Sequence, residues 1–275
     1  MAEAAPVGTL LREWRAARHL SQLDLALSAD ISSRHLSCIE TGKSQPGRDV
    51  LARLADTLDM PLRERNALLL AAGYAPHYPE SALDAPALAR IGQAIDAILA
   101  QQEPYPAFLI NRHWDVLRAN GAAERVNHFA LGGKASVHSN ILRQFFDPAD
   151  LRAAIANWEE VAGALIQHLH ERVAAAPNDR TARALLDELL SYPGVPSRWR
   201  FRDLSVTPSP LLTTALRRDH VTLRFFSTIT TFAMPRDITL DELHIECCFP
   251  ADEETASQCR ALAGSVRTSK TAQPK

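Results

Sequence analysis

One short stretch, ISSRHLSCIETGKSQPG at residues 31–47, carries small and basic polar residues where a solvated helix usually carries Glu and Lys. In a helix here, Leu36 and Ile39 lie three apart and face inward. The outward positions are then Ser33, Arg34, Ser37 and Cys38. A guanidinium can donate two hydrogen bonds to O6 and N7 of guanine, and serines permit close approach to base edges. This face therefore predicts contact with the major groove of DNA.

The surrounding sequence predicts five short helices, which begin near Thr9, Ser21, Ser32, Asp49 and Pro61. Ser21 and Asp24 have the spacing of a capping box, and Ser32 is placed to cap the third helix. Asp30 and Gly73 stand where the chain must turn, and both residue types tolerate a left-handed backbone. The second and third helices, joined by a short turn, form a helix-turn-helix whose second helix enters the major groove.

Further polar residues around these two helices are candidates for contacts to the DNA backbone. Gln22 begins the second helix, where the helix dipole favours a phosphate, and Ser32 begins the third. Lys43 and Arg48 follow the third helix. Over residues 1–79, nine Lys and Arg are balanced by nine Asp and Glu, so DNA affinity must come from local placement rather than net charge.

The run LSQLDLALSADISSRHLSCIETGK resembles the Xre/Cro-type helix-turn-helix family, with its L-S-Q-x-x-L-A and I-E-x-G-K elements. The resemblance implies sequence-specific DNA binding. It also implies a structural ion pair between Arg15 of the first helix and Glu40. Members often have Ser or Thr after the proline, whereas this sequence has Gly47, a weaker cap for the fourth helix.

Beyond a proline-containing linker, the chain alternates between helical and strand patterns. A helix is predicted over residues 87–101, followed by two strands around a turn at 111–113. One long helix is predicted over 149–176 and a shorter one over 180–191. A β-hairpin turns at 218–220, LHIECCF forms one more strand, and 252–262 forms a last helix. These elements favour an α+β sheet with a helical cover.

The segments MPLRERNALLLAAGYAPHY, EPYPAFLINRHWDVLRAN and LRFFSTITTFAMPRDITLDELHIECCFPADEETA look like those of the MmyB-like transcriptional regulators. This resemblance implies a PAS-like ligand-binding fold, with lipophilic molecules such as fatty acids as the suspected ligands. The expected organisation is an all-α five-helix DNA-binding domain over 1–75 and a linker over 76–86. An α+β PAS-like ligand-binding or dimerisation domain then covers 87–263, before a flexible tail over 264–275.

Apolar residues of the second domain are candidates for the lining of a ligand cavity, although each is equally suited to an ordinary core. From the strands and their ends these are Phe108, Ile110, Trp114, Phe225, Ile229 and Phe232, with Trp158, Leu165 and Leu169 closing the cavity. An acidic ligand would need a cation, for which Arg143 is the candidate. Asn140 and Asn157 are weaker candidates for polar contacts to the ligand.

Motifs for catalysis or metal binding are missing from the sequence. HIECC has the H-x-E of zinc deaminases without the P-C-x-x-C that completes the site, and neither H-E-x-x-H nor G-x-S-x-G occurs. We therefore expect no enzyme activity, no metal and no cofactor other than a small lipophilic ligand. The four cysteines lack C-x-x-C spacing, and no apolar run is long enough to span a bilayer. These features predict a cytoplasmic protein with reduced cysteines and no membrane contact.

The sequence thus predicts a transcriptional regulator that reads double-stranded DNA, as a homodimer because operators are commonly two-fold symmetric. A small-molecule effector in the second domain is expected to control it. Two alternatives remain open. The second domain could be a dimerisation or protein-interaction module without a ligand, or the protein could be an enzyme tethered to DNA.

Overall fold

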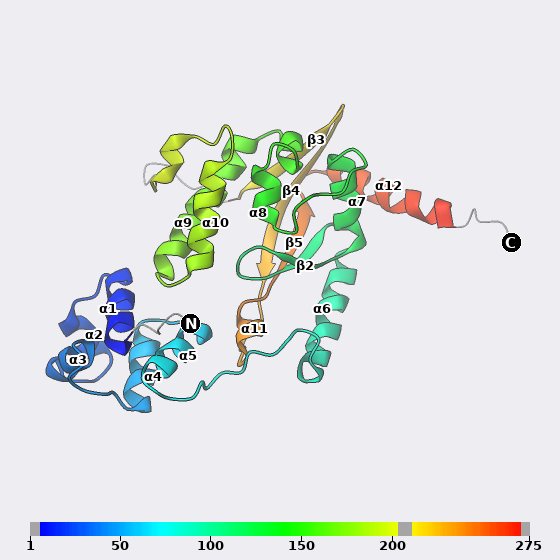
Figure 1. Ribbon diagram of the computed structural model, residues 1–275. Coiled ribbons are helices and arrows are strands. Elements are labelled where there is room, and N and C mark those ends of the chain that lie inside the picture. The colour runs from blue at the N-terminus through cyan, green and yellow to red at the C-terminus, as the bar shows by residue number, and fades with distance from the viewer. Residues whose placement is uncertain (1–5, 203–210, 271–275) are drawn as a thin grey trace. The chain divides into compact units, whose positions relative to one another are not determined.

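The structure, a computed structural model, describes residues 6–202 and 211–270 (Figure 1). The chain divides into two compact units. The first contains the chain up to Ala82 together with two short segments, Glu171–Arg180 and Phe232–Asp241, and the second contains the remaining described residues.

The first unit is helical, and the five predicted helices are confirmed. They are α1 (Val7–Ala17), α2 (Gln22–Ser28), α3 (Ser33–Glu40), α4 (Arg48–Thr57) and α5 (Leu62–Ala71). The capping box at Ser21 forms, since the Ser21 side chain accepts from the Asp24 N–H and the Asp24 carboxylate accepts from the Ser21 N–H. Asp30 (φ 52°) and Gly73 (φ 78°) adopt the left-handed backbone expected at the ends of α2 and α5. The short helix α11 (Ile238–Asp241) also belongs to this unit.

A single hydrophobic core holds the five helices together. It is built from the inward stripes of all five, and its fully buried large side chains are Leu11, Trp14, Leu25, Leu36, Ile39, Leu51, Leu54, Leu58 and Leu68. Leu36 and Ile39 are the two α3 residues that the spacing predicted to face inward. Their burial leaves the opposite side of α3 at the surface.

The second unit combines a five-stranded sheet with helices, which confirms the predicted α+β class. Its strands are β1 (Ala107–Ile110), β2 (Val116–Ala119), β3 (Thr213–Arg218), β4 (Val221–Thr230) and β5 (His244–Pro250). Its α-helices are α6 (Ala89–Gln101), α7 (Gly121–Ala130), α8 (Ile141–Phe146), α9 (Trp158–Ala175), α10 (Arg180–Ser191) and α12 (Glu253–Lys270). The end of α9, from Glu171, and the first residue of α10 are counted with the first unit. The described residues of this unit also form three 3₁₀ turns: η1 (Pro86–Leu88), η2 (Leu151–Ala154) and η3 (Ser197–Arg200).

The sheet has the order β2-β1-β5-β4-β3, and every neighbouring pair is antiparallel. The predicted hairpin joins β3 to β4, with Asp219 at φ 52° in its turn. On one face, α7, α9 and α12 contribute to a core with Leu216, Leu223 and Phe225. On the other face, α6 is tied to β2 by an ion pair between Asp96 and Arg118.

The helices of this unit differ from the predicted ones in four places. The helix expected over 149–176 is interrupted after η2, because Ile155 forms a β-bridge to Leu216 and α9 begins only at Trp158. Both α7 and α8 were missed, and each begins at an asparagine N-cap, Asn120 and Asn140. The last helix extends beyond the predicted end at 262, as α12.

Candidate functional site

The outward face of α3 presents the predicted DNA-reading residues in one row. Ser33 and Arg34 are exposed, and Ser37 and Cys38 are partly exposed. The Ser32 side chain accepts a hydrogen bond from the N–H of His35 at 3.1 Å and so begins the helix as an N-cap. No acidic residue lies in the first turn of α3, and this leaves the positive end of the helix dipole uncompensated there.

A buried carboxylate fixes α3 to the helices before it. The Nε and Nη2 atoms of Arg15 donate to the two carboxylate oxygens of Glu40 at 2.8 and 3.0 Å, and Gln22 donates to the same carboxylate at 2.6 Å. The Glu40 side chain is completely buried, whereas that of Arg15 is 19% exposed. The hydrogen bonds to Glu40 raise the pKa of Arg15 further above its usual range. This pairing joins α1, α2 and α3 through one residue.

Close packing of α1 against the end of α3 depends on a glycine. A Cβ added to Gly8 would lie 2.5 Å from the carbonyl oxygen of Glu40 and 2.6 Å from that of Ile39. Any other residue at this position would therefore push α3 away from α1. Together with the Glu40 pairing, this contact fixes the position of α3, which carries Arg34, relative to α1.

The predicted phosphate-binding residues differ in whether their side chains are exposed or already hydrogen-bonded within the protein. Lys43 is exposed just after α3. Arg48, at the start of α4, is also exposed and has its guanidinium 5.1 Å from the centre of the Tyr74 ring. The Gln22 amide nitrogen is engaged with Glu40. Gly47 precedes α4 without a side-chain cap, as the sequence predicted.

The second unit contains a cavity of about 390 Å³ between the sheet and its helices. The sheet supplies Phe108, Thr214, Phe225, Ser227, Ile229 and Glu246 to its lining, among others. Helices α7, α8 and α9 supply Val126, Leu142, Phe145, Val161, Leu165 and His168. The lining is buried at Leu142, Val161 and Phe225 and exposed at His168, Ser227 and Ile229, so the cavity opens at that end.

Comparison with known protein families assigns both units. A family model described as the MmyB-like transcription regulator ligand binding domain matches residues 91–262, which is more than half of the chain. The chain belongs to the MmyB-like transcription regulators. A second family model, of a helix-turn-helix domain, matches residues 6–68. A comparison with curated proteins finds no match.

In this MmyB-like regulator, five of the nine apolar residues predicted to line a ligand cavity are in the lining. Phe108, Trp114, Phe225 and Ile229 are among the lining residues, as is Leu165. Ile110 and Trp158 are outside the lining, and the Trp158 ring nitrogen instead donates to the carbonyl oxygen of Phe145. Phe232 falls in the segment that belongs to the first unit. Glu246 and His168 also line the cavity and were not predicted to do so.

Arg143, the cation predicted to bind an acidic ligand, is not among the residues that line the cavity. Arg143 donates to both carboxylate oxygens of Glu188, at 2.7 and 2.8 Å. Asn140 caps α8 and donates to the carbonyl oxygen of His113 at 2.7 Å. Asn157 bonds the backbone of β3. All three side chains are therefore engaged in holding the fold.

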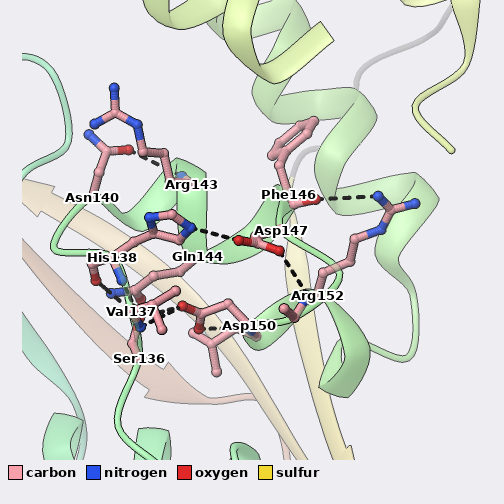
Figure 2. A network of polar contacts seen from close by, with 12 residues as sticks. Ser136, Val137, His138, Asn140, Arg143, Gln144, Phe146, Asp147, Asp150 and Arg152 are labelled. Carbon is pink, nitrogen blue, oxygen red and sulfur yellow. Dashed lines mark hydrogen bonds and ion pairs between the residues drawn. The ribbon is translucent and has the colours of Figure 1, made fainter. Parts of the chain in front are cut away.

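A polar network fixes the chain just before and after α8 (Figure 2). The Ser136 hydroxyl donates to the Asp150 carboxylate at 2.6 Å, and the His138 ring lies 2.8 Å from Asp147. The Gln144 side chain donates to the carbonyl oxygen of His138 at 2.6 Å. Because Ser136 bonds Asp150 and not the imidazole, these residues lack the serine–histidine geometry of a hydrolase. The network instead holds in place the α8 wall of the cavity.

Within the part of the chain that the structure describes, no group of three or more His, Cys, Asp or Glu side chains could hold a metal ion. No helix among these residues is long and apolar enough to cross a membrane.

Proposed function

We propose that this transcription regulator binds double-stranded DNA through the exposed face of α3, and that a small, mainly apolar molecule in the cavity controls the binding. DNA binding is supported by the exposure of Arg34 on α3, a helix that the buried Glu40–Arg15 pair holds against α1. Ser33 and Lys43 are exposed on either side of the arginine along the chain. This arrangement suits base contact by Arg34 and phosphate contact by Lys43.

We further propose that the regulator acts as a homodimer. A single helix-turn-helix contacts only a few base pairs, whereas two copies about one helical turn apart read a two-fold symmetric site. The net charge of −2 gives little non-specific attraction to DNA, which increases the need for a second set of contacts.

Replacing Arg34 with alanine is expected to weaken binding to the preferred operator by about 1–3 kcal/mol and to relax the sequence preference at one base pair. The reason is the loss of a bidentate contact to guanine with no change in the core, because the Arg34 side chain is exposed. The measurement is fluorescence anisotropy with an operator obtained by in-vitro selection and with a scrambled duplex of equal length.

The matched control is Lys43→Ala, which removes an exposed cation just after the end of α3. It should weaken binding to both duplexes equally and lower the slope of log K against log salt by about 1. Unchanged operator affinity in Arg34→Ala would show that α3 does not read the bases through this residue.

The ligand part of the proposal rests on the cavity, whose 390 Å³ falls in the range of small-molecule sites. Native mass spectrometry of the full-length regulator is expected to show an adduct of roughly a few hundred daltons that is lost on denaturation. Adding the extracted compound back to stripped protein should change operator affinity at least about five-fold, as coupled sites commonly do. An unmodified mass, together with operator affinity that no extract changes, would instead favour a dimerisation module without a ligand.

A further inference from the structure

An acidic side chain occupies the middle of the cavity's sheet wall. Glu246 lies on β5 between Phe108 of β1 and Ile229 of β4, which are its direct cross-strand neighbours. All three residues line the cavity. Ser227 lies two residues before Ile229 on the same face of β4, and its hydroxyl is 3.5 Å from the Cys248 sulfur, also on this wall of the cavity.

The described surroundings of the Glu246 carboxyl offer it no lysine or arginine as a partner. No Lys or Arg is among the described residues that line the cavity. Among the described lining residues, the other titratable groups are His168 of α9 and Cys248 of β5, and His244 lies on the same face of β5. Burial raises the pKa of the Glu246 carboxyl, and mainly burial raises that of the Cys248 thiol to about 12. The site therefore offers a carboxyl that no protein cation neutralises within the described lining.

Glu246 lies near the open end of the cavity, and this position determines which end of a bound ligand faces solvent. Its neighbours Ser227 and Ile229 are exposed and mark the open end, whereas Leu142, Val161 and Phe225 are buried further in. A polar head group would thus lie beside Glu246 near solvent, and an apolar chain would fill the inner part. A carboxylate head group would be repelled there, because two like charges in a poorly solvated site destabilise each other.

We propose that the cavity takes an aliphatic molecule with one protonated amine, whose ammonium group pairs with the Glu246 carboxylate while the chain packs against α8 and α9. An ammonium donates three hydrogen bonds, enough to reach both the Glu246 carboxylate and the Ser227 hydroxyl. The pairing supplies the cation that the described lining lacks, and a buried carboxylate gains most from such a partner. This inference rests on the proposed ligand-controlled function and names the chemical class of the ligand.

The test compares three probes with the same ten-carbon chain, decylamine, decanol and decanoate, by isothermal titration calorimetry with the full-length regulator stripped of any bound compound. Decylamine is expected to bind at least about ten-fold more tightly than decanol, which corresponds to about 1.4 kcal/mol. Decanoate should bind most weakly. Glu246→Gln should remove the advantage of decylamine and leave decanol within about two-fold, since the amide keeps the shape without the charge. Glu159→Gln, at an exposed carboxyl of α9 outside the lining, is the matched control and should change nothing.

The pH dependence gives a second, independent measurement. An alkylammonium stays protonated up to about pH 10, so below that pH a change of decylamine affinity with pH reports a change of charge on the protein. As Glu246 ionises, decylamine affinity should rise with pH, and this rise should be absent in Glu246→Gln. Equal or tighter binding of decanoate would overturn the amine preference and leave ligand control standing. Binding of none of the three probes would overturn both.

Discussion

Replacing Glu40 with alanine is expected to lower the free energy of unfolding of the first unit by about 3–5 kcal/mol. The Glu40 side chain is completely buried and accepts hydrogen bonds from Arg15 and Gln22. Without it, the Arg15 guanidinium, only 19% exposed, keeps its charge and loses its partner. Urea unfolding followed by circular dichroism measures the loss. Hydrogen exchange at the amides of α1 and α3 assigns it to this unit.

A matched exposed pair separates this effect from a general loss of charge. Arg65 pairs with Asp56, whose side chain is 66% exposed, and Asp56→Ala should change stability by less than about 1 kcal/mol. Operator affinity should fall with Glu40→Ala, because α3 is no longer held against α1 and α2. A Glu40→Ala protein as stable as the wild type would contradict the role assigned to the pair.

The first unit follows closely from its sequence, because its signals are local. The capping box at Ser21, the left-handed Asp30 and the inward pair Leu36 and Ile39 are each determined by residues a few positions apart. The Arg15–Glu40 pair spans 25 residues, and only the family resemblance pointed to it. That Gln22 joins this pair could not be read from spacing, since nothing local says which partner its amide selects.

The second unit was less predictable where long-range contacts decide the structure. The break before α9 depends on a bridge from Ile155 to Leu216, which are far apart in the sequence, and helical periodicity continues through it. Arg143 was a reasonable cation for a ligand by its apolar neighbours, but its partner Glu188 lies 45 residues away. Glu246 shows the reverse case. The sequence showed it only as part of an incomplete zinc-deaminase motif, whereas strand pairing places it in the cavity wall.

Asn120 is the residue of the second unit whose loss should be most damaging, with Asn120→Ala expected to destabilise the unit by about 2–4 kcal/mol. Its carbonyl oxygen accepts from the N–H groups of Ala107 in β1 and Ala123 in α7, at 3.0 and 2.9 Å. Its amide nitrogen donates to the carbonyl oxygens of Leu99 and Tyr105, at 3.1 and 2.8 Å. Alanine would leave these backbone groups without partners in a site from which water is largely excluded, because Asn120 is buried.

The variant Asn120→Ser divides this loss into its two parts. A serine can still accept from Ala123 as an N-cap, but it is too short to replace the bonds to Leu99 and Tyr105. Its urea midpoint should therefore lie between those of the wild type and Asn120→Ala. Because α7 carries Val126 and Asn127 into the cavity lining, decylamine affinity should fall in the same order. If Asn120→Ser were as unstable as Asn120→Ala, the cap on Ala123 would contribute nothing, and the junction of α6, β1 and α7 would depend on the bonds of Asn120 to Ala107, Leu99 and Tyr105.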